Sequence, residues 1–280
     1  MAEVFISDLP IIEKVTDNTL FVSDDGDQSN SVKASQLMGY IEENINLDGF
    51  GSVKSVNNNL LDNWYFGNPV NQRGQTSLTT TANYQYFIDR WLLYLKATVG
   101  EVVEDGVKIS VSTGTYTSLI QRLEFANELV GKPLTISVLF GDNELLSATG
   151  IITEVTANTV FASQGNTNNT RSVRLGYTPA NGVYVEFRVS AGETETIKAI
   201  KLELGGTQTL ARQEGGVWVL NEIPDYAEQL ARCQRYFQLF SASNKMPTAL
   251  VDYRPNMRTN VSTSTIVVNG TTYHCAIAEL

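Results

Sequence analysis

Short apolar runs separated by turn residues dominate the chain between residues 60 and 223. Turns are predicted at 104–106 (Glu-Asp-Gly) and 180–182 (Ala-Asn-Gly). In the run 183–189, apolar residues alternate in part with Glu186 and Arg188, which predicts a strand with one buried and one solvated face. The pattern predicts a mainly β fold, a β-sandwich of the jelly-roll type. Further β-prone runs are 92–95, 107–111, 134–140, 150–155 and 197–204.

The first 46 residues form a separate unit by their pattern. Short β-prone runs at 4–6 and 20–22 precede a polar turn, and 31–33 is suited to a second hairpin strand. Residues 34–45 have the apolar spacing of a short amphipathic helix. A module of this size buries too little apolar surface to fold securely alone, so we expect it to need a partner. Residues 47–58, rich in Gly, Ser and Asn, have the composition of a linker.

A helix is predicted over residues 224–240, where Pro224, Asp225 and Glu228 favour the first turn. Its expected apolar stripe is Tyr226, Leu230, Cys233 and Phe237. Beyond it, Asn269-Gly270 between two β-prone runs, 262–268 and 271–277, predicts a hairpin. The expected organisation is therefore an N-terminal module at 1–46, a linker at 47–58, a jelly-roll domain at 59–223, and a helix with a β-hairpin at 224–280.

Composition narrows the classes of function. The chain has 280 residues, of which 42% are hydrophobic and 18% charged, so it can bury a sizeable core. A net charge of -10 disfavours nucleic acid as a partner, because phosphate binding needs clustered Lys and Arg. No run of about 18 apolar residues is present, and the start lacks a basic stretch followed by an apolar one. We therefore expect neither membrane insertion nor a secretory signal.

The scarcity of histidine and cysteine argues against an enzyme. The single histidine, His274, adjoins Cys275, and a catalytic triad or a zinc site would have to be built around this pair. Cys233 is the only other cysteine, so no disulfide framework is expected and both thiols are predicted to be buried. Adjacent carboxylates such as Glu193 and Glu195 could be taken for the acid/base pair of a glycosidase, but we interpret them as surface charge.

Several motifs between residues 59 and 240 resemble, in one order, a domain of phage and prophage fibre proteins from gut bacteria. They lie at 59–66 and 68–75, 88–91, 121–125, 131–135, 201–205 and 231–237. Residues 6–10, with 19–22 and the helix starting near Ser35, are similar to short modules that anchor phage fibres to tails or heads. Met257-Arg258-Thr259 resembles the start of the short C-terminal β segment of that family.

The resemblance implies a jelly-roll carbohydrate-binding domain on the surface of a virion. It implies a non-enzymatic fibre protein, assembled as a homotrimer, that contacts phage capsid or tail and baseplate proteins through residues 1–46 and binds bacterial surface glycans. No cofactor is expected; a structural calcium ion is compatible with such domains, and its ligands stay unassigned. Two alternatives stay open: a purely structural head-fibre or baseplate adaptor, and an enzyme acting on polysaccharide.

The predicted glycan-binding residues are Tyr84, Tyr86, Asp89, Arg90 and Trp91, because aromatic rings stack on sugars while polar groups bond their hydroxyls. The alternative is that most of these rings belong to the core or to subunit contacts. Within the segment we expect Trp91 in the core and Tyr84 and Tyr86 exposed. Trp64 and Phe66, in the strand that opens the domain, are predicted to be core residues.

Overall fold

The computed structural model describes residues 20–24, 29–33, 57–124, 126–153, 158–244, 246–247, 253–259 and 261–279. The chain divides into two compact units, Met1–Lys54 and Ser55–Leu280. In the first unit, β1 (Leu20–Asp24) and β2 (Ser29–Lys33) pair as an antiparallel hairpin, which confirms the strands expected at 20–22 and 31–33. The expected run at 4–6 and the expected helix at 34–45 lie outside the described residues.

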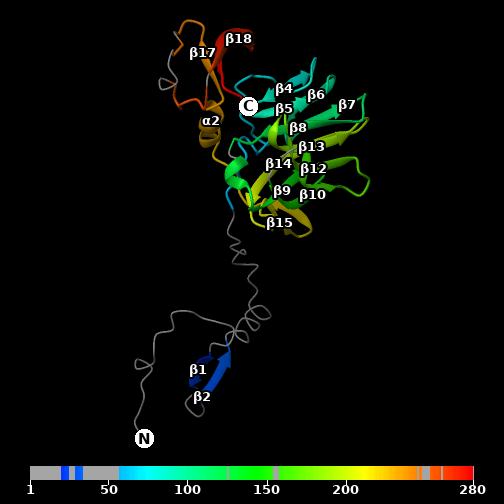
Figure 1. Ribbon diagram of the computed structural model, residues 1–280, viewed down its shortest axis with the longest axis vertical. Helices are drawn as coiled ribbons and strands as arrows, with labels where there is room; N and C mark the ends of the chain where they lie inside the picture. Colours follow the sequence, from blue (N-terminus) through cyan, green and yellow to red (C-terminus); the bar gives the residue numbers. More distant parts are fainter. Residues whose placement is uncertain are drawn as a thin grey trace. The chain divides into compact units, whose positions relative to one another are not determined.

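Two six-stranded antiparallel sheets form the body of the second unit (Figure 1). The first sheet has the order β10 (Leu145–Ile151), β9 (Pro133–Phe140), β14 (Thr194–Leu204), β7 (Gly106–Val111), β6 (Thr98–Val103) and β3 (Ser77–Thr79). The second has the order β11 (Thr159–Gly165), β12 (Arg171–Thr178), β13 (Gly182–Ser190), β8 (Tyr116–Arg122), β5 (Trp91–Tyr94) and β4 (Gln85–Ile88).

The hydrophobic core lies between the two sheets, because alternate residues of each central strand face inward. In β13 the residues that belong to this core are Val183, Val185, Phe187 and Val189. Trp64 and Phe66 join this core, as predicted. The fold is therefore a mainly β sandwich, which confirms the predicted fold class.

Consecutive strands pass between the sheets at β3–β4, β5–β6, β7–β8, β8–β9, β10–β11 and β13–β14. Such repeated crossing is compatible with a jelly roll, and that finer designation stays a prediction. The strand expected at 150–155 lies earlier in the chain: β10 begins at Leu145, ends at Ile151 and pairs with residues 133–139 of β9.

Helix α2 (Tyr226–Gln234) begins as expected, with the Asp225 carboxylate accepting a hydrogen bond from the Glu228 N–H at 2.9 Å. It ends six residues before the predicted end at 240, because the chain from Phe237 onward pairs with another strand. The expected apolar stripe is also wrong in part. Gln229 and Cys233 are the buried residues of the helix, whereas Tyr226 is 43% exposed.

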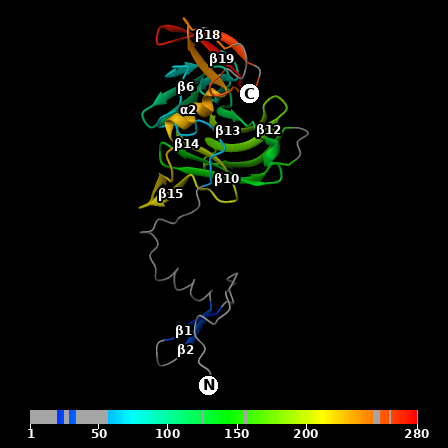
Figure 2. The same cartoon turned by 90° about the vertical axis from the view of Figure 1, so that its left-hand side faces the viewer.

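A small three-stranded sheet completes the second unit, in the order β17 (Phe237–Ser241), β19 (Thr271–Ile277) and β18 (Ser262–Val268). Asn269 and Gly270 have φ values of 48° and 77°, the left-handed conformation of the predicted hairpin turn. The sheet and α2 lie beside the sandwich (Figures 1 and 2), and the Arg73 guanidinium lies over the rings of both Phe237 in β17 and Tyr86 in β4. A further hairpin, β15 (Ala211–Glu214) and β16 (Val217–Leu220), follows β14.

Candidate binding site

The predicted glycan-binding segment divides between the surface and the interior. Tyr84 is 37% exposed and Tyr86 is half-buried, whereas Asp89, Arg90 and Trp91 are buried. The indole N–H of Trp91 donates to the Asn63 carbonyl at 2.8 Å, and its ring packs edge-on against Phe66. Trp91 is therefore a core residue, as we expected for this member of the set.

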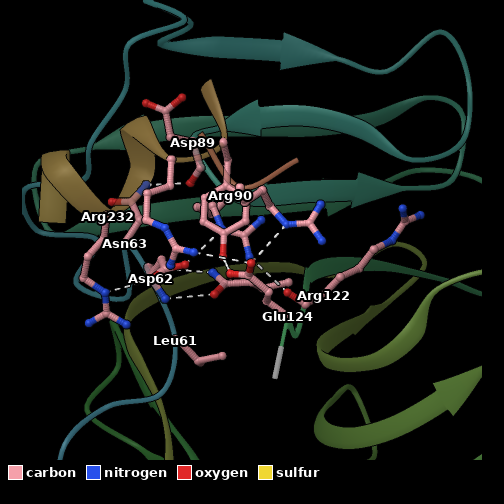
Figure 3. A network of polar contacts seen from close by, with 12 residues as sticks. Leu61, Asp62, Asn63, Asp89, Arg90, Arg122, Glu124 and Arg232 are labelled. Atoms are coloured by element: carbon pink, nitrogen blue, oxygen red, sulfur yellow. Dashed lines mark hydrogen bonds and ion pairs between the residues drawn. The ribbon is translucent and has the colours of Figure 1, made fainter. Parts of the chain in front are cut away.

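Arg90 holds separate parts of the chain together. Its Nε lies 3.0 Å from Asp62 Oδ2, and Arg232 of α2 approaches the other oxygen of Asp62 at 2.7 Å (Figure 3). The guanidinium also pairs with Glu279 at 3.3 Å and lies 3.5 Å from the centre of the Tyr236 ring. These contacts give Arg90 a structural role, and we remove Asp89, Arg90 and Trp91 from the candidate surface because a sugar cannot reach them.

Asp89 is buried with few polar contacts. One carboxylate oxygen accepts a hydrogen bond from the Gln72 N–H at 2.7 Å, and the other lies 3.7 Å from Arg73 Nε. Burial raises the pKa of Asp89 to about 7, since desolvation outweighs the opposing effects of Arg73 and Gln72. The carboxyl therefore titrates near neutrality.

A groove of about 400 Å³ lies on the outer face of the second sheet. Five tyrosines line it, namely Tyr84, Tyr94, Tyr116, Tyr177 and Tyr184, and we call it the tyrosine groove. Its volume falls in the range of sites for small ligands. Polar and charged side chains, among them Arg174, Glu186 and Arg188, line the same hollow as the tyrosines.

The strand register explains why these side chains meet. Tyr184 on β13 stands opposite Arg122 on β8, and two residues along the strand Glu186 stands opposite Ile120. Residues two apart share a face, so the outward set of β13 meets the outward set of β8. Gly176 of β12 faces Tyr184, and a Cβ at Gly176 would lie 2.9 Å from the tyrosine oxygen. The missing side chain therefore leaves room for the Tyr184 ring.

Three of the rings form a connected row. Tyr84 and Tyr94 have ring centres 5.0 Å apart, and Tyr94 and Tyr116 have centres 5.9 Å apart. Tyr84 has a φ of 59°, a conformation that is rare for an aromatic residue. Asn181 donates from its amide to the Tyr84 hydroxyl at 3.4 Å. Backbone outliers of this kind concentrate at functional sites, which favours a role for Tyr84 at the rim.

Charged groups lie among the rings. Glu186 is buried, and it accepts a hydrogen bond from the Ser118 hydroxyl at 2.6 Å. Arg188 Nε lies 2.8 Å from Glu186, and its guanidinium stacks over the Tyr116 ring at 4.0 Å. Burial is the largest cause that raises the pKa of the Tyr94 and Tyr184 hydroxyls, so both remain neutral donors at physiological pH.

A larger hollow, of about 910 Å³, has a different chemistry. Its centre is Arg171, whose guanidinium pairs with the carboxylates of Asp142, Glu144 and Glu195. These contacts neutralise the charge of Arg171. Glu195, which we interpreted from the sequence as surface charge, is thus one partner of a buried arginine. The hollow lacks aromatic rings, so we favour the tyrosine groove as the binding site.

The residues considered for catalysis or metal binding are dispersed. His274 lies in β19 opposite Phe240, and Cys233 and Cys275 are free, buried thiols, as predicted. Within the residues that the structure describes, no group of three or more His, Cys, Asp or Glu side chains is arranged to hold a metal ion. Over the same residues, the helices are too short or too polar to cross a membrane.

Sequence reasoning found part of the groove and missed the rest. It identified Tyr84, and it placed Glu186 and Arg188 on the outer face of their strand. It missed Tyr116 and Tyr184, although both stand at alternate positions in β-prone runs. The run 116–122 shows the same alternation as the run 183–189. Because β8 and β13 pair, the outward residues of the two runs, including Tyr116 and Tyr184, lie on one face of the sheet.

The chain is thus a β-sandwich protein with an aromatic groove on one outer sheet face. Comparison with known proteins adds no relative: no family model, no curated protein and no solved structure matches the chain.

The pKa of Asp89 predicts a pH-dependent stability. An unfolded aspartate has a pKa near 4, whereas Asp89 in the folded chain has a pKa of about 7. Between these two pH values the Asp89 carboxyl is deprotonated in the unfolded chain but still protonated in the folded chain. The free energy of unfolding should therefore fall as pH rises through this window, by up to about 1.4 kcal/mol per pH unit, relative to Asp89→Asn. Denaturant unfolding of both proteins from pH 5 to pH 8 measures the difference. Parallel curves would contradict the assignment, and Asp105→Asn, in an exposed turn, is the control for loss of one charge.

Proposed function

We propose that the chain binds a glycan through the tyrosine groove. The observation that carries the proposal is the row of Tyr84, Tyr94 and Tyr116 beside charged side chains in a groove of about 400 Å³. Sugars present apolar C–H faces that stack on aromatic rings, and hydroxyls that bond to polar groups. A tyrosine offers both kinds of contact in one side chain.

Rigidity supports this proposal. Tyr84 and Tyr94 flank the hairpin of β4 and β5, whose turn is held by the contacts of Arg90 with Asp62 and Glu279. A groove that is already ordered loses little conformational entropy when a ligand binds. Each site on such a shallow surface is nonetheless expected to be weak, because every sugar hydroxyl must be taken from water.

The role that fits this binding is a non-enzymatic fibre protein on the surface of a phage particle. Two features support it: the motifs of residues 59–240 that resemble fibre proteins, and the division of the chain at Lys54 into two units. We propose that residues 1–46 attach to capsid or to tail and baseplate proteins. We also propose that the protein is a homotrimer, because several weak sites on one assembly give useful avidity.

Removal of groove tyrosines should weaken glycan binding without unfolding the protein. The change is Tyr84→Ala or Tyr116→Ala in the intact chain, with binding measured on a printed array of bacterial surface glycans. We expect affinity for the bound glycans to fall at least about tenfold, because interface tyrosines commonly contribute this much. The melting temperature should change little for Tyr84, which is 37% exposed.

The matched control is Tyr226→Ala, since Tyr226 is equally accessible, at 43%, but lies on α2 outside the groove. It should bind as the unchanged protein does. If the array gives no binding, or if binding survives both groove substitutions, the glycan proposal fails. The purely structural role in a head fibre or baseplate would then be the better account.

The attachment proposal predicts that deletion of residues 1–46 leaves a folded protein that is missing from particles. The unit Ser55–Leu280 contains the whole sandwich, so the truncated chain should keep a β-type circular dichroism spectrum and the melting temperature of the sandwich. Western blots of purified phage made with truncated or intact protein measure incorporation. The full-length Tyr84→Ala variant should incorporate normally; normal incorporation of the truncated chain would refute the assignment.

A further inference from the structure

The tyrosine groove differs in charge from the rest of the protein. The chain carries a net charge of -10, yet among the residues that line the groove Arg174 and Arg188 face the single carboxylate of Glu186. Arg122 lies at the rim, where its guanidinium donates to the Asn181 side-chain oxygen at 2.8 Å and lies 5.7 Å from the centre of the Tyr84 ring. An anion would therefore meet a local excess of positive charge on an otherwise acidic molecule.

The one carboxylate in the groove is already occupied. Only 3% of the Glu186 side chain is exposed. Its carboxylate accepts a hydrogen bond from the Ser118 hydroxyl and forms an ion pair with Arg188. Its charge is thereby balanced by Arg188. It has little capacity left to repel a negatively charged ligand.

Arg174 retains donors for a ligand. Its side chain is 23% exposed, and its guanidinium lies 4.0 Å from Glu186, beyond hydrogen-bond distance. A guanidinium carries five N–H donors in a planar fork, which matches the paired oxygens of a carboxylate or a phosphate. Arg188 on the neighbouring strand is 25% exposed and stacks on Tyr116. Because its charge is paired with Glu186, the surplus positive charge among these three groups lies at Arg174.

We propose that the tyrosine groove binds an anionic saccharide, with the carboxylate or phosphate of the sugar against Arg174 and Arg188 and its ring on the tyrosines. This inference rests on the proposed glycan binding and specifies its ligand class. Uronic acids and phosphorylated sugars share the chemistry that the two arginines recognise. Neutral glycans offer the same rings for stacking but leave these guanidinium groups without an anion.

The test compares charged glycans with their neutral counterparts. The probes are uronic-acid oligosaccharides and their carboxyl-reduced forms, together with phosphorylated oligosaccharides and their dephosphorylated forms. We expect binding by at least one charged class, loss of at least about tenfold on neutralisation, and weaker binding at high salt. The class that binds identifies the source of the anion.

Arg174 provides the matched variants. Arg174→Gln should weaken binding of the charged glycan at least about tenfold, whereas Arg174→Lys, which keeps the charge but not the fork, should retain part of it. Arg212→Gln, on the exposed β15 hairpin, should change nothing. Melting temperatures of all variants verify folding.

The results distinguish failure of the anionic-ligand proposal from failure of the proposed glycan binding. If neutral and charged forms bind equally, and Tyr84→Ala abolishes both while Arg174→Gln affects neither, the groove binds glycans but the anionic ligand is refuted. If no glycan of either kind binds, the proposed function itself fails.

Discussion

Alternation along β13 is the constraint on which both the core and the groove depend. Its inward residues, Val183, Val185, Phe187 and Val189, are all buried between the sheets. The same strand must then present Tyr184, Glu186 and Arg188 on the outer face. A shift of one residue would expose Phe187 and drive Glu186 and Arg188 into the core, so burial fixes the register. Core packing thereby also fixes the positions of the groove side chains.

The junction at Asp62 provides a second constraint, at the opposite end of the β4–β5 hairpin from Tyr84 and Tyr94. Asp62 is shared by Arg90 of the hairpin turn and Arg232 of α2, and Glu279 near the C-terminus is shared by Arg90 and Arg73. Removing one partner of a buried pair is costly because a charge is left uncompensated. The helix and the small sheet are therefore tied to the sandwich, and the hairpin that carries two groove tyrosines is held in place.

Features of the fold and of the site that depend on neighbouring residues in the sequence could be predicted, whereas those that depend on distant residues could not. The hairpin around Asn269-Gly270 was predicted with its correct strands, because its turn is set by adjacent residues. The helix start at Asp225 was likewise predictable, whereas its end was not: Phe237 follows the helical spacing but pairs with Ile277, forty residues away in sequence. The burial of Asp89 and Arg90, and the contacts that hold Trp91 in the core, could not be predicted for a related reason. Their burial depends on Asn63, Asp62 and Glu279, which no local pattern connects to them.

The most direct test of the account is to observe the tyrosines while a glycan binds. Of the 12 tyrosines in the chain, five line the groove. With the tyrosine rings isotopically labelled and assigned by substitution, NMR spectra are recorded during titration with a glycan selected from the array. If the glycan binds in the groove, the shifts will be confined to Tyr84, Tyr94, Tyr116, Tyr177 and Tyr184. Shifts centred on Tyr226 or Tyr253 instead, with the groove rings unchanged, would contradict it.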